Sequence, residues 1–594
     1  MCRISGLFNS AMEITAIETI VNEMCCIQQH GGPDDMGIYS NDVHHLVLGH
    51  RRLSLIDLST GGHQPMAYQQ KRYYISYNGE LYNYQEIKAT LIKDGYRFKN
   101  TSDTEVILAA FAAWGVAAFK KFNGMFAFAL WDNETSYIYL VRDAAGIKPL
   151  YFAHTPEGLA FASEIKAFKP IPYLQEPHLN WQVYLMAYGH LPEPITTLKQ
   201  VCPLKKGHYF SLHLPTGKHQ LVCFSRYSYV EHLDNRELVI DKIKSTLSAS
   251  VKRHLLADAT VGVFLSGGID SSIMACLANK YHPNISSISL IFDDPNFSEK
   301  RYQDLVQQTL KGNHHQQLLQ ESSFHQNFEG ILKSMDLPSC DGLNTWFISK
   351  LAKEQGLKAV LSGLGGDELY GGYPSFKRIQ LVLGLQQLPA SLLRAATTKA
   401  PKKFRRICYL SIAGGIGRYL FLRGQFIPSE VAEYLGAYET EVWRILEEQP
   451  HAPSIDHLTP KNQASWLETN MYMQNQLLRD ADAMSMAHGV EIRTPFLDHE
   501  FYKLSLQICS ATKYNGAFQK QLLIDSFKDI LPEHVWNRPK MGFAFPFKNW
   551  LMKDHYASTT ISKMNSNNHQ RFLAGDLHWS QFFTMYLMEN YKNA

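Results

Sequence analysis

Cys2 is the first residue whose type and position could do chemistry, because it follows the initiator methionine directly. Removal of Met1, which is usual before a small residue, would give Cys2 both a thiol and a free α-amino group. An α-amine has a reference pKa of about 8 and can act as general base for the adjacent thiol. Alone, this arrangement only permits a thiol nucleophile, and a cysteine placed there by chance is the simpler explanation.

Two glycine-rich segments far downstream could bind an anion. Residues 264–272 read Phe-Leu-Ser-Gly-Gly-Ile-Asp-Ser-Ser, and residues 361–373 read Leu-Ser-Gly-Leu-Gly-Gly-Asp-Glu-Leu-Tyr-Gly-Gly-Tyr. Glycines allow close backbone approach, and serine hydroxyls with the N–H groups of a helix start direct donors at an anion. The first segment lacks the Gly-Lys-Ser/Thr ending of a Walker A loop. For the second segment, a structural turn with an exposed aspartate is the alternative.

The elements before residue 215 must position Cys2, and they are predicted to be mainly strands. Short apolar runs typical of strands are separated by turn signals such as Asn78-Gly79. The runs lie at residues 45–48, 73–77 and 137–141. Helices are predicted at residues 14–29 and 103–114, with Ser102 as the N-cap of the second. Strands with segregated helices predict an α+β layered domain over residues 1–215.

The glycine-rich segments lie in a second part of different texture. Residues 213–235 are the predicted join, and residues 236–594 the second domain. Buried strands are predicted at residues 259–265, 285–292 and 357–361. Their alternation with helices predicts an α/β doubly wound parallel sheet. Beyond about residue 380 the pattern is mostly helical.

Composition limits the classes of protein that the chain can be. A length of 594 residues predicts two large domains, and 45% hydrophobic with 19% charged residues is ordinary for a globular protein. A net charge of +3 is too small to indicate nucleic acid or an anionic membrane as partner. The start is no secretory signal, and no apolar run reaches the roughly 18 residues of a membrane span. Nine cysteines, an odd number without a CxxC pair, favour a reducing, cytoplasmic compartment.

Four motifs after Cys2 give it a context. They are Gly31-Gly32-Pro33-Asp34-Asp35, His50-Arg51-Arg52-Leu53-Ser54, Tyr77-Asn78-Gly79-Glu80-Leu81-Tyr82-Asn83 and Thr101-Ser102-Asp103. In this order the chain resembles the class II glutamine amidotransferases, which carry an N-terminal-nucleophile hydrolase domain. One departure is Gly31-Gly32, where that family usually has arginine before Gly-Pro-Asp. We expect this change to loosen the loop over the glutamine site.

The resemblance implies a role for each motif residue. Cys2 would be the nucleophile, and Arg52 would bind the glutamine α-carboxylate with its two-pronged guanidinium. Glu80 and Asp103 would hold the α-ammonium. Asn78 and the N–H of Gly79 would form the oxyanion hole, although Asn-Gly is also the signature of a type I′ hairpin turn.

The downstream segments extend the resemblance to the synthetase half of the glutamine-hydrolysing asparagine synthetases. Residues 264–272 resemble the pyrophosphate loop of ATP pyrophosphatases, and residues 361–373 the second asparagine synthetase signature. The implied chemistry is adenylation of a carboxylate by ATP, with Mg²⁺ held by Asp270 and Asp367. Lys540 in Arg538-Pro539-Lys540 would neutralise charge on the α-phosphate. The implied ATP-binding residues are Leu265, Ser266, Gly267, Gly268, Asp270, Ser271, Ser272, Leu290, Ser362 and Gly363.

Further segments complete the resemblance, which runs from residue 2 to about 550 and leaves the last 40 or so residues without a signature. Residues 478–485 and 491–498 match a helical segment behind the synthetase site. An internal ammonia channel would connect the two sites, and residues 124–130 could form part of its wall or be an ordinary buried strand. A homodimer is a family expectation.

The amide acceptor stays open because Leu364 stands where the family commonly has an acidic residue. Leucine cannot accept the proton released when ammonia attacks, so Glu368 or another group would have to do so. Residues 336–345 are predicted to line the acceptor pocket. Three hypotheses remain: amidation of aspartate to asparagine, amidation of another carboxylate such as a sugar acid or secondary metabolite, and a non-catalytic binding protein.

Overall fold

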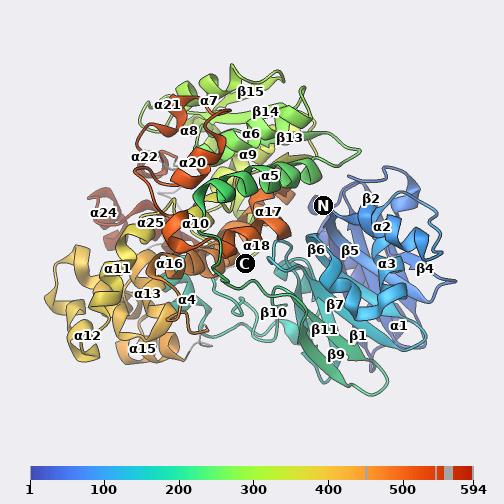
Figure 1. Cartoon of the computed structure of the whole chain (residues 1–594). Helices are drawn as coiled ribbons and strands as arrows, with labels where there is room; N and C mark the ends of the chain where they lie inside the picture. Colours follow the sequence, from blue (N-terminus) through green and yellow to red (C-terminus); the bar gives the residue numbers. More distant parts are fainter. Residues whose placement is uncertain (1, 449–452, 542–544, 554–565, 592–594) are drawn as a thin grey trace.

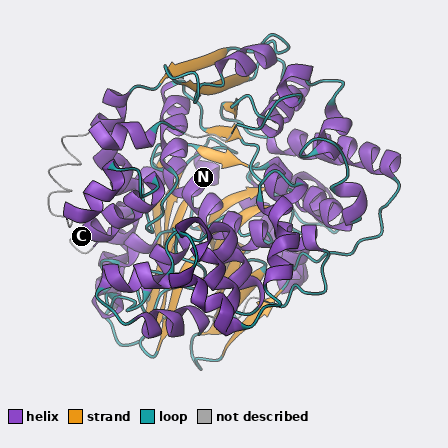
Figure 2. Ribbon diagram, turned by 90° about the vertical axis from the view of Figure 1, so that its left-hand side faces the viewer, coloured by secondary structure: helices purple, strands orange, loops and turns teal. Residues whose placement is uncertain are grey.

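The N-terminal half is built on two six-stranded antiparallel sheets (Figures 1 and 2). The computed structural model describes residues 2–448, 453–541, 545–553 and 566–591. The first sheet has the order β10-β8-β9-β1-β3-β2 and the second β12-β11-β7-β6-β5-β4. The first comprises β1 (Arg3–Asn9), β2 (Asp35–Asn41), β3 (Leu46–Arg52), β8 (Tyr151–Thr155), β9 (Gly158–Ala162) and β10 (Cys202–Pro203). The second comprises β4 (Met66–Tyr68), β5 (Tyr73–Leu81), β6 (Gly124–Asp132), β7 (Tyr137–Arg142), β11 (His208–His213) and β12 (His219–Cys223).

Helices cover the outer faces of these two sheets. Helix α1 (Ile14–Ile27) packs on β1 and β3, while α2 (Tyr84–Lys93) and α3 (Asp103–Trp114) cover the side of β5. The inner faces meet in an apolar layer that includes Ile4, Leu48 and Trp131. Ser102 caps α3, its side chain accepting from the N–H of Thr104. The predicted α+β layered sandwich, with helices at these two places, is therefore confirmed.

Two details differ from the expectations. Asn78-Gly79 is not a hairpin turn: it lies inside β5, where Gly79 pairs with Phe126. A Cβ at Gly79 would lie 2.2 Å from the carbonyl oxygen of Met125, so glycine serves close strand approach here. In addition, β12 adds to the second sheet beyond residue 215, where we expected the first domain to end.

A five-stranded parallel sheet forms the centre of the second part. Its order is β15-β14-β13-β16-β17, with β13 (Val261–Phe264), β14 (Ser286–Ile291), β15 (His314–Leu318), β16 (Ala359–Leu361) and β17 (Glu491–Arg493). Helix α6 (Ile269–Tyr281) packs on β13, and α9 (Leu343–Glu354) on β14 from the other face. The other helices beside the sheet are α5 (Arg236–His254), α7 (Lys300–Gln307) and α8 (Glu321–Ser334). The doubly wound sheet is confirmed, and its order reverses between β13 and β16.

The remainder is mostly helical, as predicted. Its helices are α10 (Gly366–Tyr370), α11 (Ser375–Leu385), α12 (Ala390–Lys399), α13 (Gly414–Arg423), α14 (Pro428–Leu435), α15 (Glu439–Glu447), α16 (Pro460–Leu467), α17 (Leu478–Met486), α18 (His499–Gln507), α19 (Ser510–Lys513), α20 (Gln521–Phe527), α21 (Glu533–Trp536), α22 (Phe547–Lys553), α24 (Ser566–Leu573) and α25 (Trp579–Tyr591). Residues 478–485 are helical, but Glu491–Arg493 is the edge strand β17 rather than helix. In the described part of the chain no helix is long and apolar enough to cross a membrane.

Helix α4 (Trp181–Tyr188) belongs in sequence to the first half but packs among the C-terminal helices. It contacts α13, α14, α15 and α25, and Figure 1 shows it among the C-terminal helices rather than with the two sheets. The N–H of Gln425 donates to the carbonyl of Ala187 at 2.9 Å. The segment without a recognised signature also contributes here, because Phe582 and Met588 of α25 are fully buried.

Candidate active sites

Cys2 lies at the start of β1, between the two antiparallel sheets. The register pairs Arg3 with Arg51, which brings Cys2 next to the end of β3. Its Sγ lies 3.9 Å from the carbonyl oxygen of Leu53. Burial raises the pKa of the Cys2 thiol, and the nearby charge of Arg52 opposes that rise. A raised pKa favours the protonated thiol, so a base must take its proton before attack.

The side-chain amide of Asn78 is buried, and the structure gives it no hydrogen bond to a described residue. Both Oδ1 and Nδ2 lack a hydrogen-bond partner among the residues that the structure describes. A buried amide without partners costs about 1–3 kcal/mol, so such a group needs a reason. A developing oxyanion requires such a free donor, and Asn78 lies in β5, which contacts β1, the strand that follows Cys2.

Arg52 is held firmly by backbone carbonyls. Its Nη1 donates to the carbonyl of Ser59 at 2.8 Å, and its Nη2 donates to that of Asp57. The guanidinium also packs against Gly62, where a Cβ would lie 1.9 Å from Nη2. The glycine therefore makes room for the cation, which leaves Arg52 pre-positioned without a carboxylate partner in the described structure.

Glu80 and Asp103 form a buried acidic pair. Asp103 Oδ2 accepts from the hydroxyl of Tyr77 and from the N–H of Leu81, both at 2.9 Å. Burial raises the pKa of Asp103 to about 6, and burial raises that of Glu80 well above its usual range. Two carboxyl groups so placed need a cation to be fully charged, and Arg493 Nη2 lies 3.3 Å from Glu80 Oε1.

The loop that lacks the family's arginine is packed rather than loose. A Cβ at Gly31 would lie 2.7 Å from Nε of Arg3, so the Arg3 side chain fills the space beside the glycine. Arg51 Nε donates to the carbonyl of Gly32 at 3.1 Å. These contacts contradict the expectation that the two glycines loosen the loop.

The two glycine-rich segments meet at the carboxyl ends of β13 and β16, where the strand order reverses. A Cβ at Gly366 would lie 2.5 Å from the Asp270 carboxylate, and one at Gly363 would lie 2.8 Å from the Asp270 Cβ. The absence of side chains therefore lets the two loops touch. Crevices at such switch points are where doubly wound sheets bind their ligands.

The first loop directs several donors at one place. Ser266 Oγ and Ser271 Oγ lie 2.9 Å apart, and the N–H of Gly268 donates to Ser266 Oγ at 3.3 Å. Ser272 Oγ is buried and has no partner among the described residues. Helix α6 begins directly afterwards, so its free N–H groups add to a site for phosphate. Leu265 and Leu290 are buried, so these two could meet a nucleotide only through backbone groups.

Charged residues from four segments converge beside the loops. Lys520 Nζ lies 2.7 Å from Asp270 Oδ2 and 2.7 Å from Asp367 Oδ1, and Lys540 Nζ lies 2.7 Å from Asp367 Oδ2. Despite burial, the two lysines lower the pKa of Asp367 to about 2. For Asp270, burial outweighs the effect of Lys520 and raises the pKa. Asp270, Asp367 and Lys540, which the sequence placed in one site, do lie together.

The same carboxylates suit a divalent cation. Asp270 Oδ1 is buried without a partner in the described parts of the chain, and the Lys520 ammonium already occupies a bridging position between the two aspartates. Mg²⁺ commonly takes one or two carboxylates and completes its shell with phosphates and water. The residues present therefore fit Mg²⁺ brought in with a nucleotide. The described residues contain no cluster of three or more candidate metal ligands.

Two basic residues of this site escaped sequence reasoning. Lys520 lies outside every motif and 250 residues from Asp270, so only the fold reveals it. Arg538 was noted only as part of the Lys540 motif. Its Nη2 donates to the carbonyl of Gly267 at 2.9 Å and pairs with Glu299 at 2.6 Å. Arg538 thereby fixes the glycine-rich loop that contains Gly267.

Position 364, where the resemblance predicts an acidic residue, is occupied by an apolar leucine. Leu364 is half-buried and packs against the main apolar core. Glu368 is fully engaged, accepting from the hydroxyl of Tyr373 at 2.7 Å and from the N–H of Gly365 at 3.1 Å. Burial raises the pKa of Glu368 to about 7. Another buried acid, Asp480, receives the hydroxyl of Ser339 at 2.5 Å, and burial raises its pKa to about 7 as well.

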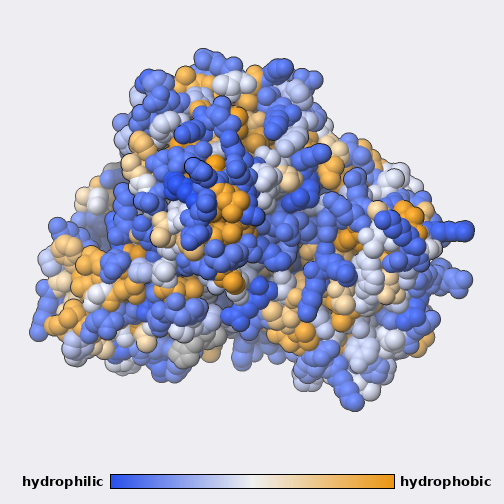
Figure 3. All heavy atoms as spheres, viewed as in Figure 1, coloured by the Kyte–Doolittle hydropathy of each residue, from blue (hydrophilic) through white to orange (hydrophobic). Residues whose placement is uncertain are grey.

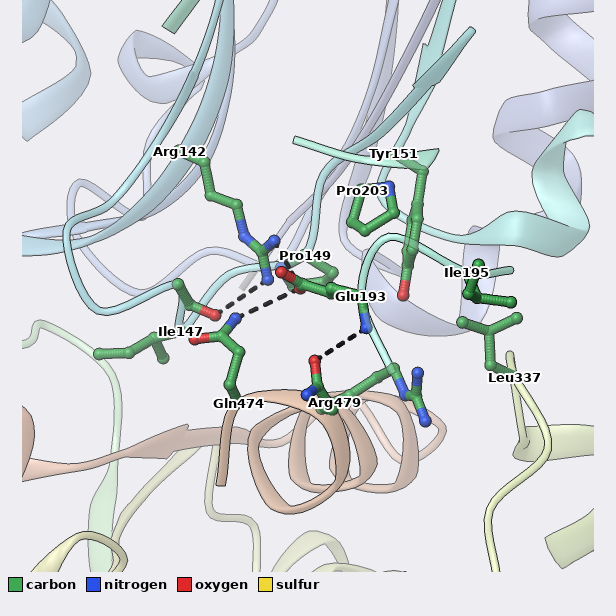
Figure 4. A pocket seen from close by; sticks show the side chains of 12 residues that line it. Arg142, Ile147, Pro149, Tyr151, Glu193, Ile195, Pro203, Leu337, Gln474 and Arg479 are labelled. Carbon is green, nitrogen blue, oxygen red and sulfur yellow. Dashed lines mark hydrogen bonds and ion pairs between the residues drawn. The ribbon is translucent and has the colours of Figure 1, made fainter. Parts of the chain in front are cut away.

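One cavity lies beside the parallel sheet, and another lies between the two halves of the molecule. One of about 440 Å³ opens at the carboxyl ends of β14 and β15, lined by Phe292, Asp294, Leu319 and Trp550 among others. This volume is within the range of small-molecule sites. The other, of about 10 Å³, lies between the two halves, where Arg142 pairs with Glu193 at 2.9 Å (Figure 4). Gln474 donates to the same Glu193 carboxylate, so this cavity has room for about one water molecule.

A cysteine site in an N-terminal-nucleophile sandwich and a phosphate crevice in a doubly wound sheet define a glutamine amidotransferase joined to an ATP-dependent amidating ligase. Residues 1–227 match the glutamine amidotransferase domain model, and residues 242–578 match the asparagine synthase model. The chain belongs to the asparagine synthase family.

Curated relatives cover most of the chain. The chain is 29% identical to asparagine synthetase [glutamine-hydrolyzing] 1 of Bacillus subtilis, covering 93% of this chain and 88% of the relative. It is 30% identical to a putative asparagine synthetase of Mycobacterium tuberculosis, covering 88% and 84%. It is also 27% identical to amidase chry2 of Gibberella zeae, again covering 88% and 84%. Members with different names therefore share this architecture.

Proposed function

We propose that the chain hydrolyses glutamine at Cys2 and transfers the ammonia to a carboxylate that ATP has activated. The Cys2 sulfur attacks the carboxamide carbon, and the thiol proton passes through the α-amine to the leaving nitrogen as the C–N bond breaks. Water then hydrolyses the thioester and releases glutamate. Asn78 and Gly79 would stabilise the oxyanion, while Arg52, Glu80 and Asp103 would hold the amino-acid end of glutamine.

In the second reaction, a carboxylate oxygen attacks the α-phosphorus of ATP and pyrophosphate leaves. Ammonia then attacks the acyl carbon, the C–O bond breaks, AMP leaves, and a base takes the surplus proton. The loop with Ser266, Gly267, Gly268, Ser271 and Ser272 would hold the pyrophosphate. Asp270 and Asp367 would hold Mg²⁺, which supplies charge neutralisation between the phosphates.

The observation that carries this proposal is the charge cluster at the switch point. Lys520 and Lys540 both reach Asp367, and Lys520 also reaches Asp270, each at 2.7 Å. A nucleotide with Mg²⁺ would take over the aspartates and free two ammonium groups for the α-phosphate. Ser362 and Gly363 would border the same phosphate, and the cavity beside β14 would take the nucleoside next to Leu290.

We propose that ammonia passes between the sites through a mostly apolar region. Met125 and Ile147 from the first half pack in one buried cluster with Met473 and Leu478 from the second. Of residues 124–130, which were expected to line the channel, Ala127 and Ala129 lie instead between the two sheets. An apolar route keeps ammonia neutral and away from water. We also propose a reducing, cytoplasmic location, because Cys2 must remain a thiol, and a homodimer as the assembly.

For the acceptor we propose aspartate, giving asparagine, on the strength of the relatives' printed names. A different carboxylate, such as a sugar acid, is the second candidate, because Leu364 is apolar and Glu368 is already engaged by Tyr373 and Gly365. The matches to amidases chry2 and chyE also favour it. A non-catalytic role would not need the free amide of Asn78.

The deciding measurement is pyrophosphate release from full-length protein with ATP, Mg²⁺, ammonium and one carboxylate at a time. Release with aspartate, together with asparagine in the product, supports the first candidate. Release only with another carboxylate supports the second. Absence of release across a broad panel, from protein that still hydrolyses glutamine, would refute ATP-dependent amidation.

A further inference from the structure

Residues 369–429 carry a strong positive charge that the small net charge of the whole chain does not reveal. Residues 369–429 contain ten lysines and arginines and no aspartate or glutamate. The whole chain has 58 basic and 55 acidic residues, so the remainder has 48 and 55 and a net charge of −7. The net charge of +3, which argued against an anionic partner, is therefore the sum of two parts of opposite charge, +10 and −7.

Most of these cations have no internal counter-charge. Three are paired with acids from elsewhere: Arg394 with Glu447, Arg418 with Asp456, and Arg423 with Glu468. The other seven form no ion pair with any described residue. Five of the seven are exposed: Lys377, Arg378, Lys399, Lys402 and Lys403. Unpaired surface charges of one sign create a field that attracts an anionic partner.

The same stretch exposes large apolar side chains. We call residues 375–411, which contain α11, α12 and the 3₁₀ segment Lys402–Ser411, the basic lobe. Its exposed members include Leu381 (61% exposed), Leu392 (58%) and Phe404 (49%), with Leu388 at 41%. Helix α12 packs along the 3₁₀ segment over a small core of Val382, Leu393 and Leu410, so the lobe is folded.

The lobe lies at an edge of the molecule. Figure 1 shows α11 and α12 at the lower left, on the far side from the two antiparallel sheets. In Figure 3 apolar side chains gather over this region, with polar ones beside them. Lys403 Nζ lies 4.9 Å from the centre of the Phe404 ring, so a cation and an exposed aromatic side chain are adjacent.

We propose that the basic lobe docks on the surface of an anionic lipid bilayer. Clustered lysines attract acidic headgroups, while exposed leucine and phenylalanine side chains enter the boundary between headgroups and acyl chains. Nucleic acid would satisfy the lysines but leave the leucines in water. This docking is peripheral, and it is independent of the amidation reaction proposed above.

The experiment is flotation of full-length protein with vesicles of pure phosphatidylcholine or of phosphatidylcholine mixed with phosphatidylglycerol. We expect binding to the mixed vesicles alone, weakened by salt because headgroup attraction is screened. The triple variant Lys399→Glu, Lys402→Glu, Lys403→Glu should bind at least roughly 100-fold more weakly, since each basic residue contributes about fivefold. The triple variant Leu381→Ser, Leu392→Ser, Phe404→Ser should lose the binding that persists at high salt.

The matched control is Lys93→Glu, Lys120→Glu, Lys218→Glu, which makes the same charge change at exposed lysines outside the lobe. It should keep lipid binding near that of the unaltered protein, and circular dichroism checks that all variants fold. Equal weakening by the control would overturn the proposal, as would absence of binding to mixed vesicles. Lobe variants that instead dissociate a dimer would assign the surface to a second copy of the chain and also overturn it.

Discussion

Arg493 Nη2 lies 3.3 Å from Oε1 of Glu80, and this pair joins strands of two different sheets. Glu80 lies in β5 beside Asn78, whereas Arg493 ends β17 at the edge of the parallel sheet. The carbonyl of Arg493 accepts the N–H of Ser362 at 2.8 Å. One arginine therefore contacts both a residue of the proposed glutamine site and the start of the second nucleotide loop.

Replacing this arginine should weaken glutamine binding more than ammonia-dependent synthesis. Arg493 also donates to Glu491 at 2.6 Å and to the carbonyls of His254 and Leu256, a fork that lysine cannot reproduce. We expect Arg493→Lys to raise the KM for glutamine by roughly tenfold, a loss of about 1.4 kcal/mol. Parallel assays of glutamate release and of ammonia-dependent pyrophosphate release measure the two effects.

The control is Arg253→Lys. Arg253 pairs with Asp498 at 2.8 Å, and Asp498 accepts from Asn123 of the first half at 3.4 Å, so this contact also crosses between the halves. It does not involve Glu80. An equal rise in KM for both variants would show that general docking of the halves, not the Glu80 contact, controls glutamine binding.

Lys520 should be essential for activation of the carboxylate. Lys520→Met removes the ammonium that lies between Asp270 and Asp367, so charge developing on the α-phosphate loses a donor. We expect pyrophosphate release to fall by at least roughly 100-fold. Lys528→Met changes an exposed lysine just after α20 and is the matched control. Normal pyrophosphate release from Lys520→Met would mean that the 2.7 Å contacts are only structural.

The pH dependence of glutamine hydrolysis should report the acidic pair. In the proposed glutamine site, only an ionised Asp103 would attract the α-ammonium of glutamine, and burial raises the pKa of Asp103 to about 6. Below that pH the carboxyl binds a proton, so kcat/KM for glutamine should fall about tenfold per pH unit; because Glu80 is coupled to it, the apparent value belongs to the pair. Asp103→Asn should lower kcat/KM and shift or remove this limb. An unchanged limb in that variant would assign it to another group.

Cys2→Ala should abolish glutamate release while ammonia-dependent synthesis continues. The variant removes the sulfur, whose nearest hydrogen-bond acceptor is the Leu53 carbonyl at 3.9 Å, and therefore disturbs no tight contact. Glutamate release and pyrophosphate release with ammonium are measured side by side. Full glutaminase activity in Cys2→Ala would show that the nucleophile is another residue.

The sequence predicted those strands and helices that have a clear run of apolar residues or a capping residue. Apolar runs in the sequence predicted the strands near residues 73, 137 and 261. Helices α1 and α3 were also predicted, and Ser102 marked the start of α3. Strand β15 has the sequence His-His-Gln-Gln-Leu and no apolar pattern, so nothing in the chain marks it. Asn78-Gly79 has turn chemistry, but pairing of β5 with β6 overrides that local preference.

The site was predictable where motifs are contiguous. Cys2, Asn78 and Asp270 stand in contiguous, recognisable motifs, and their roles remain predictions. Lys520 and Arg493 could not be found in this way, because their roles depend on contacts across 153 and 413 residues of sequence. Such contacts follow from packing of whole elements, which residue spacing does not encode.

The position of α4 has a consequence for engineering. Because α4 packs among α13, α14, α15 and α25, the polypeptide crosses into the helical region and returns before the first half is complete. The two catalytic units are therefore not interchangeable modules separated by a linker. A chimera that exchanges the glutaminase for that of a relative must carry matching partners for Tyr184, whose hydroxyl donates to the carbonyl of Ile445 at 3.2 Å.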